Sequence, residues 1–235
     1  MRSFATRSDE PEWMDAPGLE AGALAACLKD LARTNTLTRA RPPTLGWLAG
    51  AVRPLGPAAR FTLLDVGCGH GDMLRAVAGW ARRAGLRPSL TGIDLNPESI
   101  ALARAASPSC DSRFLASDVF DYRPDEPIDF VISSLVTHHM PDATLTRFIG
   151  WMEANARRGW FVNDLHRHPL AYYGFMALST AARLDPIVRH DGKVSVARAF
   201  VREDWERQLA AAGLSNGEAR IAWRFPFRIC VGRLK

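Results

Sequence analysis

Three glycines separated by single residues are the feature of this sequence that most directly suggests chemistry. Gly67, Gly69 and Gly71 close the apolar stretch LLDVGCGHGD, residues 63–72. Glycine lets a backbone turn sharply and approach a ligand closely. Loops of this general kind hold nicotinamide dinucleotides and also S-adenosylmethionine, so the spacing of the glycines and their neighbours must separate the two.

The residue after the third glycine favours the second ligand. In the dinucleotide pattern G-x-G-x-x-G, counting from Gly67 places the last glycine at position 72, which is Asp72. Asp72 begins a predicted helix, where amide groups and the helix dipole favour an anion. A dinucleotide would put its pyrophosphate there, but a carboxylate already holds the place. A ligand with a positive sulfonium centre fits better, and a nicotinamide oxidoreductase is disfavoured.

Two further carboxylates follow the next predicted strands. Asp94 ends the segment GIDLN and can accept hydrogen bonds from both ribose hydroxyls, which either cofactor would use. Asp118, in LASDV, could accept a hydrogen bond from an adenine amino group. The alternative for Asp118 is a helix cap or a turn former, as short carboxylates often are.

Together these residues resemble class I S-adenosylmethionine-dependent methyltransferases, and the segment SSLVTHHMPD resembles the small-molecule subgroup similar to ubiquinone-biosynthesis enzymes. The match to D/E-x-G-x-G-x-G falls on Asp65 and the three glycines. The resemblance to the family as a whole is specific for residues 61–142. The resemblance implies that S-adenosylmethionine is bound and S-adenosylhomocysteine is left as product. It implies these cofactor-binding residues: Asp65, Gly67, Gly69, Gly71, Asp94, Leu95, Asp118, Val119 and Ser134.

Histidines after two predicted strands are the candidate catalytic residues. His138 and His139 follow the fourth strand, at the edge where doubly wound folds bind ligands. Methyl transfer by in-line displacement needs a base only if the acceptor must lose a proton. His139 either serves as that base or only shapes the loop. His166 lies in NDLHRHP after the fifth strand, a segment that suits a substrate rim better than a metal site, and we expect no metal.

The periodicity predicts the elements that position these residues. Residues 1–57 are expected to form a loose arm, up to residue 18, and a helical lid, with helices over Leu19–Arg33 and from after Pro43 to about Val52. Residues 58–235 are expected to form an S-adenosylmethionine-binding methyltransferase domain. Strands alternate there with helices, which predicts a doubly wound, mainly parallel α/β sheet. The resemblance implies a Rossmann-like methyltransferase fold with seven strands, the last antiparallel. Strands are expected at 61–66, 89–95, 112–119, 128–136, 159–165, 215–221 and 225–233, and helices at 72–84, from Pro97, at 142–156 and at 202–213.

Apolar segments outside this alternation are expected to cover a substrate. The segment 169–184 is apolar nearly all round and either covers the site or packs on the sheet. We expect lining side chains from this cover helix and from the N-terminal region, because small-molecule pockets are mainly apolar with a few polar groups. These are Trp13, Asn35, Trp47, Tyr172, Tyr173, Phe175 and Met176. The acceptor is then expected to be a small aromatic or acyl-chain-bearing molecule. Short segments, among them NDLHRHPLAYYGF, resemble small bacterial methyltransferases of polyketide or phenolic-lipid pathways, which implies a phenolic, quinone or polyketide-like acceptor of secondary metabolism, methylated at oxygen.

Composition limits the remaining alternatives. The chain has 235 residues, 47% of them apolar, and four scattered cysteines, which favours a reducing, cytoplasmic setting. No apolar run approaches the roughly 20 residues that span a bilayer. The net charge is +5, but the basic residues are spread along the chain, so nucleic acid is not an expected partner. C-methylation of a quinone or lipid-like acceptor, an RNA or protein acceptor, a non-catalytic cofactor-binding partner or sensor, and a homodimer stay open.

Overall fold

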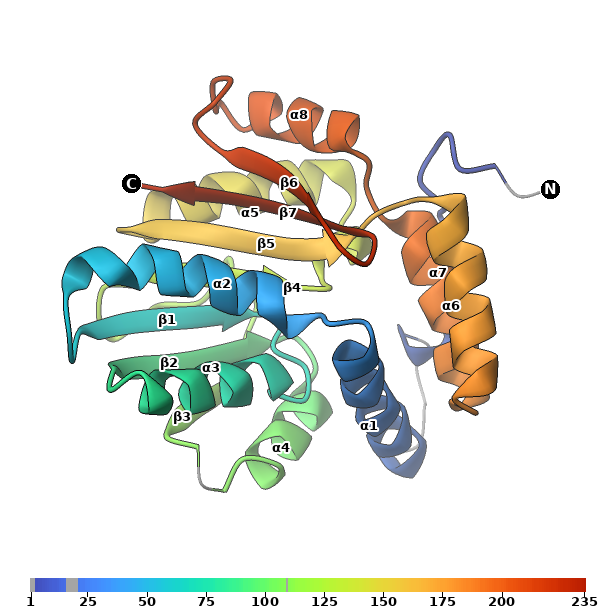
Figure 1. The fold of residues 1–235 in the computed structure, drawn as a ribbon, viewed down its shortest axis with the longest axis horizontal. Helices are drawn as coiled ribbons and strands as arrows, with labels where there is room; N and C mark the ends of the chain where they lie inside the picture. Colours follow the sequence, from blue (N-terminus) through green and yellow to red (C-terminus); the bar gives the residue numbers. More distant parts are fainter. Residues whose placement is uncertain (1–2, 16–20, 109) are drawn as a thin grey trace.

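The computed structural model describes residues 3–15, 21–108 and 110–235, and it is built around one seven-stranded sheet (Figure 1). The strand order is β3-β2-β1-β4-β5-β7-β6, and β7 runs antiparallel to both of its neighbours while the other strands share one direction. This confirms the predicted α/β fold class. The strands are β1 (Arg60–Val66), β2 (Arg87–Asp94), β3 (Ser112–Ala116), β4 (Phe130–Ser134), β5 (Gly159–Leu165), β6 (Arg220–Arg224) and β7 (Arg228–Leu234).

Helices cover both faces of the sheet and divide its core in two. On one face lie α2 (Arg41–Val52), α3 (Asp72–Arg83) and α4 (Pro97–Ala105), whose buried side chains meet those of Phe61 and Leu63 from β1. On the other face lie α5 (Asp142–Asn155) and α8 (Arg202–Ala211), which pack against Leu64 and Val66. Because β1 is buried on both faces, its apolar residues point to both sides of the sheet instead of alternating with polar ones, as is typical of a central parallel strand.

The second N-terminal helix packs on one face of the sheet and does not form a lid. α2 buries Leu48, Ala51 and Val52 and contacts β5, so it closes the core beside α3. It begins at Arg41, before the two prolines that were expected to precede it. Proline is tolerated in the first turn, where its missing N–H has no helical partner to lose.

A third group of helices lies beyond the carboxyl edge of the parallel strands, where the arrows of β1 and β5 point in Figure 1. It consists of α1 (Ala21–Leu37), α6 (Pro169–Ala181) and α7 (Pro186–Arg198), and a small apolar cluster joins α1 to the start of α7. The predicted start of α1 at Leu19 lies outside the described residues. The pattern of the sequence did not predict α7, although α7 is the helix that joins this group to the arm and to the site.

The prediction of a loose N-terminal arm was wrong for the part that the structure describes. Over residues 3–15, Arg7 Nη2 donates hydrogen bonds to the carbonyl oxygens of His138 and Met140, at 2.9 and 3.0 Å. Glu12 is buried, and the short helical turn η1 (Trp13–Asp15) contacts α7. The arm therefore crosses the carboxyl edge of the sheet. None of the described helices is long and apolar enough to pass through a bilayer.

Candidate active site

The glycine loop after β1 adopts a conformation that only glycine takes readily. Gly67, Gly69 and Gly71 have φ angles of 71, 49 and 73°, in the left-handed region. A Cβ atom on Gly67 would lie 2.3 Å from a side-chain methyl of Val136. The loop is drawn back onto β2, because the amides of Gly67 and Cys68 both donate to the Ile93 carbonyl. The spacing of the glycines thus follows from backbone geometry and close packing.

Asp94, at the end of β2, is tied to this loop. Its Oδ2 accepts a hydrogen bond from the Gly69 amide at 2.9 Å, and its Oδ1 accepts one from Asn96 N at 3.0 Å. The side chain is only partly buried, so the carboxylate is fixed in place and still accessible to a ligand. Leu95, which follows it, exposes 74% of its surface. Asp118 is exposed and accepts from Phe120 N at 2.9 Å, so in this structure it forms the turn that was its alternative role.

A cavity of about 220 Å³ lies between the glycine loop, α1, the turn after β4 and α7. It brings together six of the predicted site residues: Asp65, Gly67, Gly69, Ser134, His138 and His139. Gly71, Asp94, Leu95, Asp118, Val119 and His166 are not among its lining residues. Of the predicted substrate cover, Asn35 and Phe175 reach the cavity, whereas Tyr172, Tyr173 and Met176 do not.

Asp65, the acid at the end of β1, is the most unusual group in this cavity. It is 1% exposed, and its Oδ2 has no hydrogen-bond partner among the described residues. Burial, with a further contribution from the negative charges of Asp72 and Asp94, raises the pKa of Asp65 well above its usual value. A buried carboxylate without a partner is unfavourable, and a cation placed in the cavity would relieve it. The site is therefore suited to a positively charged ligand.

Asp72 occupies the first position of α3, as predicted. Its Oδ2 accepts hydrogen bonds from Asn35 Nδ2 at 3.3 Å and Arg41 Nε at 3.2 Å, which links α3 to α1 and α2. The carboxylate thus lies at the positive end of the α3 dipole and beside a guanidinium. Arg41 and the N-terminus of α3 compensate the charge of Asp72. The positive end of the helix is therefore already occupied and would not bind a phosphate well.

His138 forms a buried pair with Asp164, which lies near the end of β5. His138 lies in the short turn η3 (Thr137–His139), and its Nδ1 is 2.7 Å from Asp164 Oδ1. The amide of His138 and the hydroxyl of Thr137 donate to the other oxygen of the same carboxylate. Burial opposes ionisation of Asp164, but the pairing with His138 and these hydrogen bonds outweigh it and lower its pKa to about 2. The carboxylate therefore fixes the orientation of the ring and leaves Nε2 turned toward Glu12.

Glu12 completes this cluster from the N-terminal arm, and sequence reasoning missed it. Glu12 Oε1 lies 3.8 Å from His138 Nε2, and Oε2 lies 3.8 Å from His139 Nε2. The hydroxyl of Ser195, on α7, donates to Glu12 at 2.8 Å, and Arg198 lies 3.8 Å away. One ligand atom from each of Glu12, His138 and His139 would also satisfy the distances of a metal site. No local pattern marks Glu12, because its partners lie more than 120 residues away in the sequence.

The remaining polar residues of the segment NDLHRHP do not converge on the cavity. Asn163 is buried under α2, where its side-chain amide donates to the Ala40 carbonyl at 2.7 Å and to Thr44 at 3.1 Å. The ring of His168 accepts a hydrogen bond from Leu170 N and caps α6. His166 donates its backbone amide to Phe227 and lies outside the cavity lining, so the structure does not place it with His138.

Arg228, at the start of β7, is a second residue that sequence reasoning missed. It is 1% exposed and lines the cavity beside Leu165, with which it pairs across the sheet. Its Nη2 donates to Thr38 Oγ1 at 3.1 Å, while Nε and Nη1 have no hydrogen-bond partner among the described residues. In the sequence, an arginine in the last strand is most simply interpreted as a surface residue, so no signal marked it.

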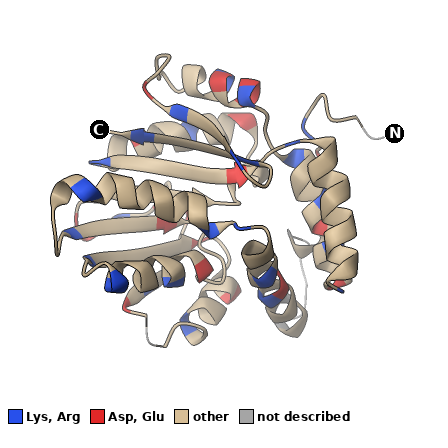
Figure 2. Cartoon of the chain, viewed as in Figure 1, with Lys and Arg blue, Asp and Glu red and all other residues tan. Residues whose placement is uncertain are grey.

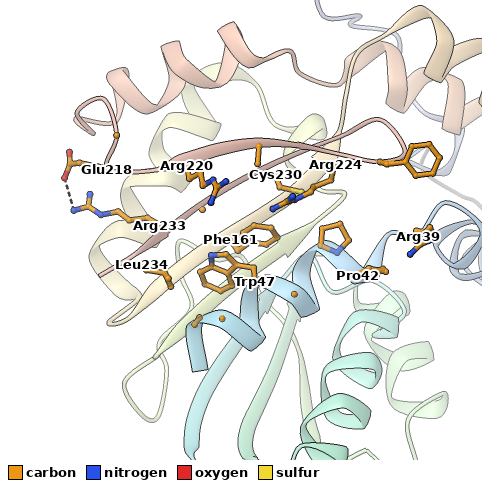
Figure 3. Close-up of a pocket in the computed structure, with 18 residues that line it drawn as sticks. Arg39, Pro42, Trp47, Phe161, Glu218, Arg220, Arg224, Cys230, Arg233 and Leu234 are labelled. Atoms are coloured by element: carbon orange, nitrogen blue, oxygen red, sulfur yellow. Dashed lines mark ion pairs between the residues drawn. The ribbon is translucent and has the colours of Figure 1, made fainter. Parts of the chain in front are cut away.

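The tryptophans predicted to cover the substrate lie elsewhere. Trp13 is half exposed and stacks on His190 with 3.8 Å between ring centroids. Trp47 stacks on Phe161 in a separate cavity of about 900 Å³ between α2 and the hairpin of β6 and β7 (Figure 3). Figure 3 also shows Arg220 on the β6 side of this second cavity. Contrary to the sequence-based expectation, Trp13 and Trp47 therefore do not line the cavity that contains Asp65 and His138.

The strand order, the antiparallel β7 and the glycine loop after β1 define the Rossmann-like fold of class I methyltransferases. Solved methyltransferase structures share this fold. The plantazolicin methyltransferase BpumL, solved with a desmethylPZN analog and SAH, has a TM-score of 0.62 at 14% identity, over 92% of this chain and 97% of that one. The magnesium protoporphyrin IX methyltransferase of Synechocystis PCC 6803, solved with SAH, has a TM-score of 0.55 at 17% identity, over 84% and 82%.

The sequence comparisons agree with the fold. Residues 63–159 match the family described as "Methyltransferase domain". The trans-aconitate 2-methyltransferase of Enterobacter sp. (strain 638) is 33% identical over 95 residues, which is 40% of this chain and 35% of that protein. The corresponding enzyme of Klebsiella pneumoniae (strain 342) is 32% identical over 81 residues, which is 34% of this chain and 29% of that protein. The chain spans about a third of the length of these relatives.

Proposed function

We propose that this protein is an S-adenosylmethionine-dependent methyltransferase that methylates an oxygen of a small phenolic, quinone or polyketide-like acceptor. The observation that carries the proposal is the unpartnered, buried carboxylate of Asp65, which faces the same cavity as the His138–Asp164 pair. A buried carboxylate without a partner and an oriented imidazole in one cavity suit a cationic methyl donor and an acceptor that must lose a proton.

The donor half of the site is assigned to the ends of β1, β2 and β3. S-adenosylmethionine supplies an electrophilic methyl group on a positively charged sulfur. Asp65 faces the positively charged part of the ligand, and Gly67 and Gly69 allow its close approach to the backbone. Asp94, held by the Gly69 amide, accepts hydrogen bonds from the ribose hydroxyls. The remaining residues assigned to the donor, on the adenine side and along the loops, are Gly71, Leu95, Asp118, Val119 and Ser134.

The acceptor half uses the histidines after β4. Asp164 holds His138 through Nδ1, so that Nε2 receives the proton of the acceptor hydroxyl, and Glu12 stabilises the resulting imidazolium. His139 Nε2 lies 3.8 Å from the other oxygen of Glu12, and His139 positions this carboxylate. We leave His166 out of the proposed catalytic set, because its ring lies outside the cavity lining. No step requires a metal, since Ser195 and Arg198 already compensate Glu12.

The cover of the acceptor is assigned to α1, α6 and α7 rather than to α6 alone. α1 contributes Leu28 and Leu31, α6 contributes Phe175, and α7 contributes Val196. An apolar wall that excludes water favours both an aromatic or acyl-chain-bearing acceptor and an in-line displacement, which depends on positioning. In this proposal the N-terminal lid over the acceptor consists of α1 and the arm that carries Glu12.

The proposal also covers partners and location. Lys and Arg are interspersed with Asp and Glu over both layers of helices (Figure 2), which does not favour nucleic acid as a partner. The four cysteines are free in this structure, and we propose a cytoplasmic location on that basis. A homodimer stays a prediction, which light scattering on the purified protein would measure.

The experiment is transfer of a labelled methyl group from S-adenosylmethionine to a panel of phenols, hydroquinones and hydroxylated polyketide-like compounds. Asp94→Ala is the matched control, because it removes the ribose acceptor while leaving the buried core untouched. We expect labelled product with the wild-type protein and none with a folded Asp94→Ala variant. Labelling of total RNA or protein instead of any small acceptor would contradict the proposed acceptor class.

A further inference from the structure

The side chain of Arg228 is a buried cation that lacks a full set of partners. It is 1% exposed, and a guanidinium offers five N–H donors. Thr38 Oγ1 accepts one hydrogen bond from Nη2, whereas Nε and Nη1 have no partner among the described residues. Buried arginines are normally paired with an anion, because a desolvated charge without a partner is strongly unfavourable. Two of its three nitrogens therefore lack an acceptor among the described residues.

The nearest carboxylate is not available to fill this role. Asp164 lies close enough to Arg228 to influence its charge electrostatically, but the pair forms no ion pair in the described structure. Both oxygens of Asp164 already accept hydrogen bonds, from His138, Thr137 and Leu165 N. Arg228 lines the cavity, and the acidic groups of the same lining lie elsewhere or are engaged: Asp72 accepts from Arg41, Glu12 accepts from Ser195, and Asp65 lies at the end of β1.

The position of Arg228 in the sheet assigns it to the acceptor half of the cavity. The residues proposed to hold the donor lie at the ends of β1, β2 and β3, whereas β7 lies beyond β4 and β5 in the strand order. Arg228 pairs across the sheet with Leu165, one residue after Asp164, and so it lies on the same side of the site as the proposed base. His138 and Arg228 both line the cavity of about 220 Å³.

We propose that Arg228 binds a carboxylate of the methyl acceptor, so that the acceptor is an organic acid whose anionic end pairs with the guanidinium. This inference rests on the proposed function and specifies its substrate class. A planar guanidinium presents its N–H groups in a fork that suits the two oxygens of a carboxylate. The acceptor is then held at two points, its carboxylate on β7 and its reactive oxygen at His138, which orients that oxygen for in-line attack.

The test compares carboxylates with their neutral counterparts on the purified full chain, in the presence and absence of SAH. The probes are benzoate, 4-hydroxybenzoate, cinnamate and hexanoate, each paired with its primary amide. Binding is measured by calorimetry and by the shift in Tm, which rises when a ligand binds only the folded state. The variants are Arg228→Met and Arg228→Lys, and Arg220→Gln on β6 is the matched control for loss of an exposed arginine.

We expect at least one acid to bind more tightly than its amide, and Arg228→Met to weaken that acid by about 30-fold or more. Arg228→Lys should restore part of the binding, and Arg220→Gln should change nothing. Without ligand, Arg228→Met should have an equal or higher Tm, because it removes a buried charge that lacks a partner. A folded Arg228→Met that binds the acids as the wild type does, or a panel in which no acid is preferred over its amide, would overturn the proposal.

Measurements of SAH affinity distinguish the two possible sources of the carboxylate, which are the methyl acceptor and the methyl donor. If Arg228 instead held the carboxylate of the donor, Arg228→Met would weaken SAH but not 5′-methylthioadenosine, which lacks the amino-acid part, and the proposal would be overturned. Unchanged SAH affinity together with loss of acid binding supports it. Failure of the wild-type protein to bind SAH would count against the proposed function itself, whatever the acids do.

Discussion

His138 Nδ1 and Asp164 Oδ1 lie 2.7 Å apart in a buried pair that joins the turn after β4 to the end of β5. The pair is held by neighbours on both strands, and Glu12 from the N-terminal arm lies at the other ring nitrogen. Three segments that are far apart in the sequence thus meet at one imidazole. This arrangement fixes the orientation of the imidazole.

Loss of the ring at position 138 should affect turnover more than binding. We expect His138→Gln to lower kcat by about 100-fold or more, the usual contribution of a positioned base, while SAH binds with unchanged affinity. His166→Gln should retain kcat, because His166 lies outside the cavity lining. Steady-state kinetics with an active acceptor and calorimetry with SAH measure the two quantities. Full activity in a folded His138→Gln variant would remove this residue from the mechanism.

Cofactor binding should release a proton from Asp65. Burial raises the pKa of this carboxyl group, so the free protein holds it protonated over a wider pH range than an ordinary aspartate. A bound cation favours the ionised form, and affinity for SAH should therefore fall as pH is lowered through the raised pKa. Calorimetry below about pH 7, in buffers of different ionisation enthalpy, measures this, since the α-amino group of SAH stays charged there.

The control for this prediction is Asp65→Asn, which should bind SAH more weakly and without the pH dependence. Proton uptake on binding, or an affinity that does not change with pH in the wild-type protein, would show that the cation does not meet Asp65.

Chelation should leave activity intact. Glu12, His138 and His139 have the spacing of a metal site, but Glu12 already accepts from Ser195 and lies beside Arg198. We expect protein dialysed against EDTA to retain its kcat and added Zn²⁺ to give no increase. Elemental analysis of the purified protein accompanies the assay. Loss of activity on chelation that Zn²⁺ restores would make this cluster a metal centre instead.

Two alanine substitutions in the glycine loop should separate packing from ligand contact. Gly67→Ala combines a left-handed φ of 71° with a Cβ 2.3 Å from Val136, and we expect a loss of about 2–4 kcal/mol in the free energy of unfolding. Gly69→Ala has no atom within 4 Å of its new Cβ, so only the backbone strain of about 1 kcal/mol applies. Denaturant unfolding measures both free energies. Equal losses would contradict the packing argument.

Gly69→Ala should also affect ligand binding. The open space at Gly69 belongs to the cavity, so its Cβ should weaken SAH binding in a protein that is otherwise close to normal stability.

The sheet and the donor loop could be predicted because their signals are local. Continuous apolar runs marked the central strands, and the glycine spacing with Asp72 followed from the conformation of one turn. The rule that parallel strands bring their carboxyl ends to one edge placed His138 in the site. These features need only neighbouring residues and a general rule of topology.

What the sequence did not indicate depends on tertiary contacts. α7 carries β-branched residues, Gly192 and charged side chains in a weak pattern, and its Asp191 is buried because the amides of Trp13 and Met14 donate to it. Glu12 and Arg228 are ordinary surface residue types until the arm and β7 bury them. Asp118 could be interpreted in two ways from the sequence, and the structure shows it forming a turn.

Binding of SAH and of NAD to the purified protein, measured in parallel by calorimetry, distinguishes the two cofactor classes. We expect micromolar binding of SAH, loss of that binding in a folded Asp94→Ala variant, and no binding of NAD, because Asp72 holds the place of the pyrophosphate at the start of α3. Binding of NAD without binding of SAH would contradict the interpretation of the glycine loop, and the roles assigned to Asp65 and His138 would fall with it.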